Sequence, residues 1–241
     1  MNETVRQKRE KPASPKAVFI RQASHEIQGS FFGVASICAM LKMASGSKGD
    51  TEILLDHLMD ACRTYKYKLS NFLEFTRFDA GLDDTILESV DLRELLNRVV
   101  HENQASAAER KVKIALYVSD DMPVQVLTDE LRIAQICSNL LSNAVNFSPP
   151  GSPVSIQVRR EAGDNWAIVV EDEGVGMTAD ELDRAFDLSA ASRNALKNPG
   201  GLGLLVTRYL VEDVLKGTIA LSGRSPAGTI CKVILSLNEK I

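Results

Sequence analysis

The chain has 241 residues, enough for one large domain or two modest ones, since domains usually hold about 100 to 150 residues. Its content of 44% hydrophobic and 25% charged residues is typical of a folded globular protein and excludes disordered, collagenous and fibrous chains. A formal net charge of -4 provides no overall basic field, so we expect no nucleic acid among its partners.

The sequence predicts no membrane span, zinc site or disulfide framework. No apolar stretch approaches the ~18 to 20 residues of a transmembrane helix, and the N-terminus lacks the apolar core of a signal peptide. The four cysteines, Cys38, Cys62, Cys137 and Cys231, lie far apart among apolar residues, so we predict buried, reduced thiols. We expect a cytoplasmic protein, with membrane contact only if a sensor region outside this sequence carries it.

The N-terminal third of the chain predicts a helical hairpin. Residues 1–15 are polar and charged with two prolines, which favours a flexible leader. Within residues 16–80, apolar side chains recur at helical spacing over about 17–44 and 51–78, with the turn sequence SGSKGD at 45–50. Two such helices form an antiparallel hairpin that buries only one face of each. We therefore predict a homodimer in which two hairpins form a four-helix bundle.

Residues 85–241 form a second predicted domain, because strands and helices alternate there as an α/β sandwich requires. The segment DAGLDD at 79–84 is the predicted linker. The predicted strands cover 86–90, 113–118, 125–128, 155–160, 166–171, 218–222 and 229–237, and the predicted helices cover 91–110, 129–147 and 204–215. The expected fold class is a helical hairpin followed by an α/β domain.

His25 lies on the first predicted helix in ASHEIQG, directly before Glu26. A neutral imidazole is a nucleophile toward a phosphoryl group, and a neighbouring carboxylate can accept its proton or orient the ring. The pair alone is also typical of a solvated helix surface, so its meaning depends on the motifs that follow. His57 and His101 lie among charged or polar residues and receive no role.

Two asparagines lie four residues apart in the predicted helix 129–147. Asn139 and Asn143 project from one face of that helix, with Asn146 and Phe147 one turn further on. The amide oxygen of Asn can ligate a hard cation such as Mg²⁺ without adding negative charge near phosphates. A structural hydrogen-bonding role is the alternative, because an amide buried in an apolar helix needs partners.

Two glycine-containing turns complete the motifs. In VEDEGVGM, Asp172 ends an apolar strand and precedes Gly174 and Gly176. Its carboxylate can accept a hydrogen bond from an exocyclic amine such as that of adenine, and the glycines let the backbone turn sharply against a ligand. In NPGGLGLL, Gly201 and Gly203 directly precede the helix predicted from residue 204, so bare N–H groups are expected to face a phosphate.

Together, these motifs closely resemble those of the sensor histidine kinases. ASHEIQG is similar to the H box of that family, SNLLSNAVNF to its N box, VEDEGVGM to its G1 box and GGLGLL to its G2 box, while Phe186 resembles its F-box residue. The resemblance covers about residues 17–237. It implies a dimerisation hairpin followed by the Bergerat-type α/β ATP-binding domain shared with gyrase, Hsp90 and MutL.

The resemblance also implies roles for single residues. His25 would take the γ-phosphoryl group of ATP, with Glu26 as base. Asn143 would ligate magnesium, and Asp172 would bind the adenine amine. The other residues expected at the ATP site are Asn139, Asn146, Phe147, Gly174, Gly176, Gly201 and Gly203. The implied cofactors are ATP and Mg²⁺, and the implied partner is the receiver domain of a response regulator, which accepts the phosphoryl group on an aspartate.

Three positions depart from the family pattern. Gly29 stands four residues after His25, where the family usually has a Thr or Asn that positions water for dephosphorylating the partner. We therefore predict weak phosphatase activity. Asn146 replaces a basic residue, and Pro199 replaces the first glycine of the G2 pattern, and both changes weaken the predicted phosphate contacts.

Two other functions stay open at this stage. One is a histidine phosphotransfer adaptor whose ATP site has decayed, which Asn146 and Pro199 favour and the retained Asn143 and Asp172 disfavour. The other is an ATPase of the gyrase or Hsp90 kind, in which a glutamate on the asparagine helix activates water. That position holds Asn139, and the hairpin histidine would have no function.

Overall fold

The computed structural model describes residues 85–186 and 201–237 continuously and, nearer the N-terminus, helical residues at 27–29, 31–41, 51, 53–55, 57–59, 61–62, 65, 69 and 73. His25, Glu26, the predicted leader and the predicted turn at 45–50 lie outside the described residues. The ring of Phe31 lies 6.0 Å from that of Tyr65, so the two helical stretches lie side by side. This contact agrees with a hairpin.

The strands are β1 Glu88–Val90, β2 Lys113–Val118, β3 Val126–Thr128, β4 Pro153–Glu161, β5 Asn165–Asp172, β6 Thr218–Gly223 and β7 Thr229–Ser236. Five of them form a mixed sheet in the order β2-β4-β5-β7-β6, in which β2 and β4 are parallel and the other neighbours antiparallel. β1 and β3 form a separate antiparallel pair. All seven predicted strands are confirmed, with small shifts at their ends.

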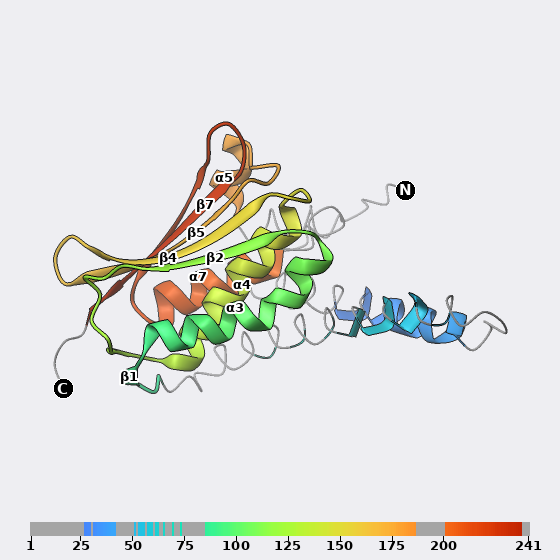
Figure 1. Cartoon of the computed structure of the whole chain (residues 1–241), viewed down its shortest axis with the longest axis horizontal. Helices are drawn as coiled ribbons and strands as arrows, with labels where there is room; N and C mark the ends of the chain where they lie inside the picture. Colours follow the sequence, from blue (N-terminus) through green and yellow to red (C-terminus); the bar gives the residue numbers. More distant parts are fainter. Residues whose placement is uncertain are drawn as a thin grey trace, which may run out of the picture.

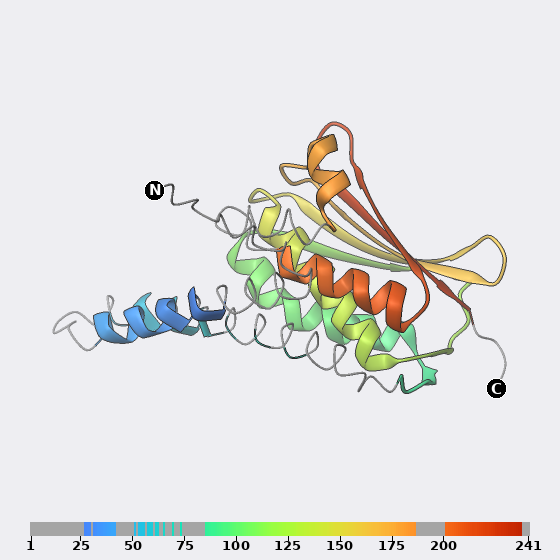
Figure 2. The ribbon, with the colours of Figure 1, turned by 180° about the vertical axis from the view of Figure 1, so that it is seen from behind.

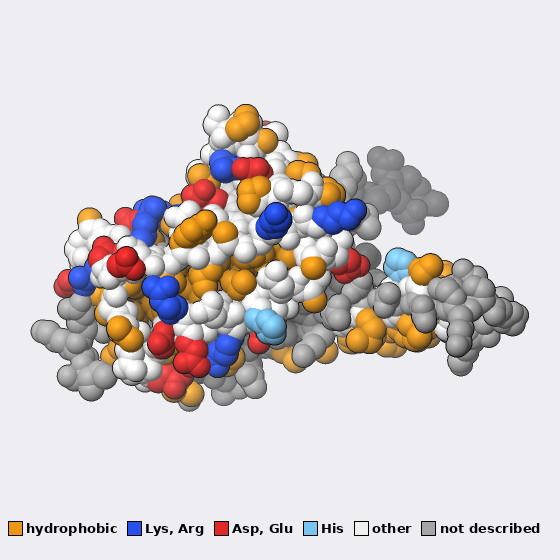
Figure 3. Space-filling model, viewed as in Figure 1, with side chains coloured by type: hydrophobic (Ala, Val, Ile, Leu, Met, Phe, Trp, Pro, Cys, Tyr) orange, Lys and Arg blue, Asp and Glu red, His pale blue; other side chains and the backbone are white. Residues whose placement is uncertain are grey.

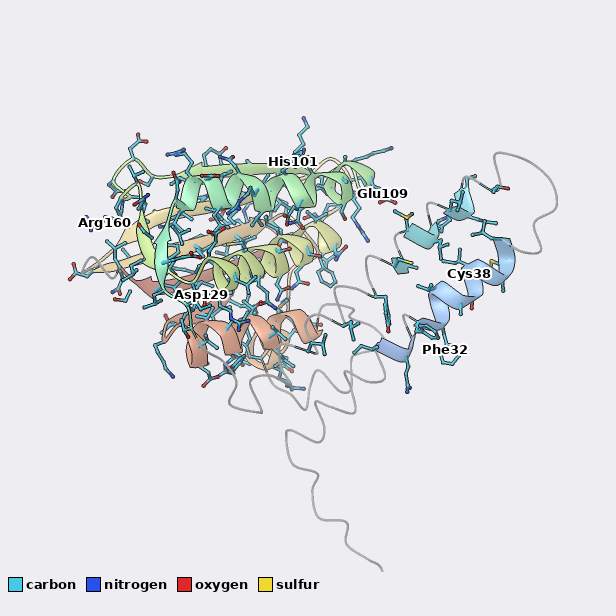
Figure 4. All side chains as sticks on the ribbon, turned by 90° about the horizontal axis from the view of Figure 1, so that it is seen from below. Phe32, Cys38, His101, Glu109, Asp129 and Arg160 are labelled. Atoms are coloured by element: carbon cyan, nitrogen blue, oxygen red, sulfur yellow. The ribbon has the colours of Figure 1, made fainter. Side chains whose placement is uncertain are left out.

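The helices are α3 Leu92–Glu109, α4 Glu130–Phe147, α5 Ala179–Arg184 and α7 Gly201–Tyr209, and α7 continues into a π-helical turn, η1 Leu210–Val214. Figures 1 and 2 show α3, α4 and α7 as one layer on one face of the sheet, and Figure 4 shows them side by side from the helical side. The α/β sandwich predicted for this part of the chain is therefore confirmed.

The short helix α5 was not predicted. Its start is set by Thr178, whose hydroxyl accepts from the Glu181 N–H at 3.3 Å while the Glu181 carboxylate accepts from the Thr178 N–H at 2.9 Å. This reciprocal capping satisfies two main-chain donors. None of its residues is buried, so the sequence carries no apolar periodicity there.

The two layers meet in one apolar core. Ile133, Ile136 and Leu141 of α4 are fully buried, as are Ile156 of β4 and Ile168 of β5. Along β5 every residue from 166 to 170 is buried, which explains the uninterrupted apolar sequence of that central strand. The core thus holds α4 and the end of β5 in fixed positions, and these two elements carry the candidate site.

Asp129 fixes the start of α4 (Figure 4). Its Oδ1 accepts from the Arg132 N–H at 3.0 Å as an N-terminal cap, and its Oδ2 accepts from the Ile86 N–H at 3.0 Å. One buried carboxylate therefore joins the segment after the linker to the helix that carries the asparagines.

The prediction of four buried thiols is wrong in part. Cys137 and Cys231 are buried, and burial raises the pKa of both thiols to about 12. Cys38 is half-buried and Cys62 exposed on the N-terminal helical segments. Among the described residues, no helix is long and apolar enough to cross a bilayer. The described part of the face in Figure 3 mixes apolar, basic and acidic side chains.

Candidate functional site

Asp172 ends β5 as a buried carboxylate, 8% exposed. Its Oδ1 accepts two main-chain hydrogen bonds, from the Gly174 N–H at 2.8 Å and from the Thr229 N–H at 3.1 Å. Burial raises the pKa of Asp172, while these two bonds and the charge of Arg224 act in the opposite direction. Because both bonds end on Oδ1, Oδ2 is the oxygen that can accept from a ligand.

Glycines allow three segments to approach closely at this carboxylate. A Cβ atom added at Gly174 would lie 2.6 Å from the carbonyl oxygen of Phe147, at the end of α4. Gly228, in the turn between β6 and β7, packs so tightly against the carbonyl of Asp172 that no side chain fits there. Gly176 has a φ of +71°, a conformation that glycine adopts without strain. The end of α4, the segment after β5 and the β6–β7 turn therefore meet at one place.

Asn139 is almost fully buried, 1% exposed, and faces α7. Its Nδ2 donates to the Thr207 hydroxyl at 3.3 Å and to the Gly203 carbonyl at 3.5 Å. The Thr207 hydroxyl in turn donates to the same carbonyl at 2.8 Å. Asn139 thus joins α4 to α7 from inside the protein, the structural role considered as the alternative.

Asn143 lies one turn further along α4 and is half-buried. Its Nδ2 is buried but finds no hydrogen-bond partner in the described part of the chain. Leaving a buried donor unpaired costs ~1–3 kcal/mol, so such a group marks a place where a ligand acceptor would be favourable. The same amide offers Oδ1 to a hard cation.

The other residues expected on this helix have different surroundings. Asn146 is exposed, and its Nδ2 donates to the Ser142 hydroxyl at 3.4 Å. Its carbonyl accepts from Arg110 Nη1 at 3.4 Å. Phe147 is half-buried and contributes the carbonyl that faces Gly174.

The prediction that Gly201 and Gly203 precede the helix is wrong, because α7 begins at Gly201 and both glycines form its first turn. The N–H groups of a first helical turn have no partner within the helix, so the expected donors exist, but inside the helix. Nearby, the guanidinium of Arg208 on α7 lies 5.5 Å from the ring centre of Phe186, which packs against the core just after α5.

Sequence reasoning missed four residues that the fold brings to this site: Thr207, Arg224, Gly228 and Thr229. Thr229 follows Asp172 by 57 positions, and Thr207 follows Asn139 by 68. The only local signal was the turn sequence SPAGT before the last strand. It marked a turn without indicating what the turn contacts.

Comparison with known proteins identifies the domain that carries this site. Residues 128–240 match the family described as histidine kinase-, DNA gyrase B- and HSP90-like ATPase. The matched segment contains Asn139, Asn143 and Asp172 as well as Gly228 and Thr229.

Among curated proteins, the chain is 26% identical to the cell-division control histidine kinase PdhS of Brucella canis, over 95% of this chain and 23% of the relative. The chain spans about a quarter of the length of the curated relatives it matches.

Two solved structures share the fold. Full-length ShkA in complex with AMPPNP has a TM-score of 0.63 and 23% identity over 92% of this chain and 46% of that one. The histidine kinase ThkA in complex with the response regulator protein TrrA has a TM-score of 0.64 and 16% identity over 90% of this chain and 60% of that one. At these identities the likeness concerns the fold alone.

Gly174→Ala is expected to disrupt the meeting of α4 and the segment after β5. The added Cβ would lie 2.6 Å from the Phe147 carbonyl oxygen and 2.8 Å from Asp172 Oδ1, so these groups must separate. Urea denaturation should show that the free energy of unfolding falls by about 1–3 kcal/mol. Gly223→Ala on β6 is the control, since no atom lies within 4 Å of its added Cβ. Equal stability of the two variants would contradict the close approach.

Proposed function

We propose that this chain, which belongs to the sensor histidine kinases with an ATP-binding domain of the gyrase B and HSP90 type, phosphorylates its own His25 from ATP. It then passes the phosphoryl group to an aspartate of a response regulator. The observation that supports this best is that two polar side chains, one of Asp172 and one of Asn143, lie on neighbouring segments. Buried Asp172 and Asn143, whose buried Nδ2 has no hydrogen-bond partner among the described residues, lie on segments that touch where Gly174 meets Phe147.

The residues present fit ATP with Mg²⁺. ATP supplies the γ-phosphoryl group, and the cation neutralises charge on the phosphates. We assign Asn143 two tasks: its Oδ1 ligates the cation, and its buried Nδ2 donates to a phosphate oxygen. The N–H groups of Gly201 and Gly203 at the start of α7 are proposed as further donors to the phosphates.

Asp172 is assigned to the base of the nucleotide. Its Oδ1 is held by the N–H groups of Gly174 and Thr229, so the carboxylate is oriented before a ligand arrives. Oδ2 then accepts from the exocyclic amine of adenine. Of the other expected residues, Asn139 positions α7, Gly176 allows the turn, and Asn146 and Phe147 form the end of α4.

His25 and Glu26 carry the second half of the proposal, with His25 as phosphoryl acceptor and Glu26 as its base. We propose that two hairpins pair as a homodimeric four-helix bundle. Large apolar side chains that a single chain leaves exposed on the helical segments support this pairing: Phe31, Phe32, Met40, Ile53, Leu55, Met59 and Leu73. The protein is proposed to act in the cytoplasm, where ATP is available.

The first experiment incubates the purified chain with Mg²⁺ and γ-labelled ATP. We expect incorporated label that is labile in acid and stable in alkali, as phosphohistidine is, and its loss in His25→Ala and in Asn143→Ala. His101→Ala and Asn103→Ala, two polar positions on α3, serve as controls that keep the label. A folded wild-type protein that takes no label would favour the phosphotransfer adaptor with a decayed ATP site.

Asp172→Asn should change the choice of nucleotide. The introduced amide oxygen can keep the bonds from Gly174 and Thr229, but its NH₂ group would oppose the adenine amine, donor against donor. We expect affinity for ATP to fall about 10- to 100-fold and affinity for inosine triphosphate, whose base offers an acceptor, to rise relative to ATP. Calorimetric titration measures both. An unchanged ratio of the two affinities would contradict the proposal that Asp172 binds the adenine amine.

We propose that this protein has weak phosphatase activity toward its response regulator, because Gly29 provides no side chain to position water. This glycine lies on the first helix with no atom within 4 Å of an added Cβ, so a larger residue fits there. Gly29→Thr adds a hydroxyl that can position water, and we expect faster loss of phosphate from a phosphorylated receiver domain. Gly33→Thr, one turn further and equally open, is the matched control. The same rate in both variants would contradict the assignment.

A further inference from the structure

Three consecutive carboxylates, Glu171, Asp172 and Glu173, lie at the end of β5, and one arginine from another strand pair reaches them. Arg224, directly after β6, places Nη1 2.7 Å from Glu173 Oε1 and Nε 4.0 Å from Glu171 Oε2. The side chains of Arg224 and Glu173 are 32% and 42% exposed. The arginine therefore bridges the two residues that flank the buried carboxylate.

The main chain of the β6–β7 turn, which begins at Arg224, also contacts Asp172. The Arg224 N–H donates to the Gly228 carbonyl at 3.0 Å, which closes the turn between β6 and β7. Gly228 packs on the carbonyl of Asp172, and the next residue, Thr229, donates its N–H to Asp172 Oδ1. Arg224 thus closes the turn through its main-chain N–H and attaches it to the end of β5 through its side chain. Figure 1 shows this turn at the same end of the sheet as α5.

The charge of Arg224 also acts on Asp172. Burial favours the protonated carboxyl and raises the pKa of Asp172, whereas the positive charge of Arg224 lowers it. Glu171 and Glu173, the other charged groups beside Asp172 in the described structure, both face the same arginine, whose single positive charge offsets part of their negative charge. The neighbours from other segments, Phe147 and Thr229, carry no charge.

We infer that Arg224 is a positioning residue of the nucleotide site. Its main-chain N–H and its ion pairs with Glu173 and Glu171 hold the turn 224–229 against Asp172, and its positive charge adds to the hydrogen bonds that favour the ionised carboxylate. This inference rests on the proposed ATP function and adds a residue that does not touch the nucleotide. Arg159 provides the comparison, because it pairs with Glu161 at 3.2 Å on β4 of the same sheet, where Lys232 also binds Glu161.

The test measures ADP affinity by calorimetry between about pH 5 and pH 8 for the wild type, Arg224→Ala and Arg159→Ala. The ionised carboxylate of Asp172 is a stronger acceptor for the adenine amine than the protonated carboxyl group, and removing the positive charge of Arg224 raises the pKa of Asp172. In Arg224→Ala, we expect affinity at pH 7 to fall about three- to fivefold and the acid loss of affinity to begin at a higher pH. The phosphate groups of ADP titrate alike in every variant, so the difference from Arg159→Ala isolates Asp172.

A charge exchange separates electrostatics from simple loss of structure. Arg224→Glu should bind ADP more weakly than Arg224→Ala, and adding Glu173→Arg to it should recover affinity and move the pH profile back toward that of the wild type. A profile in Arg224→Ala identical to that in Arg159→Ala, or no recovery in the double variant, would overturn the inference.

One outcome concerns the proposed function instead. If folded wild-type protein binds no ADP at any pH, the ATP assignment fails, and hydrogen exchange in nucleotide-free protein tests the positioning role alone. Faster exchange of the Thr229 amide in Arg224→Ala than in Arg159→Ala supports Arg224 as the residue that holds the turn. Equal exchange in the two variants rejects it.

Discussion

The buried carboxylate of Asp172 is the group on which the rest of the site depends. A carboxylate in an apolar interior is costly unless hydrogen bonds and a nearby cation compensate it. Here the compensation comes from the Gly174 and Thr229 N–H groups and from Arg224. The two N–H groups require a close approach of main chains, and that requirement accounts for Gly174 and Gly228. The close packing of the main chains and the stabilisation of the buried carboxylate therefore depend on the same segments.

Helix α4 shows how one sequence pattern produces two different roles. Asn139 and Asn143 lie one turn apart on the same face. The Nδ2 of Asn139 donates hydrogen bonds to Thr207 and Gly203, whereas the Nδ2 of Asn143 has no partner in the described structure. The first amide holds two helices together, and the second is available to a ligand. The Asp129 cap at the other end of α4 fixes where both amides lie along the helix.

In the proposed function, the chemistry is divided between two parts of the chain. The nucleophile belongs to the hairpin, while the groups that orient ATP belong to the α/β unit. Phosphoryl transfer depends mainly on positioning and on neutralising charge, so the protein must bring these parts together for each reaction. Arg224 would contribute to that positioning at a distance, by holding the nucleotide site in its binding arrangement.

Local patterns in the sequence determined much of this protein. Apolar periodicity predicted all seven strands and the three long helices, and the motifs pointed to Asn143 and Asp172. Apolar periodicity reports only on segments that bury apolar side chains, so it did not predict α5, which has no buried residue. It also placed the start of α7 too late, because Gly201 and Gly203 have no side chain to contribute to the pattern. Only the tertiary structure decided which asparagine is used internally and which residues reach Asp172. Thr229 and Arg224 approach it because β7 pairs with β5 and carries the β6–β7 turn to its end, a contact set by sheet order.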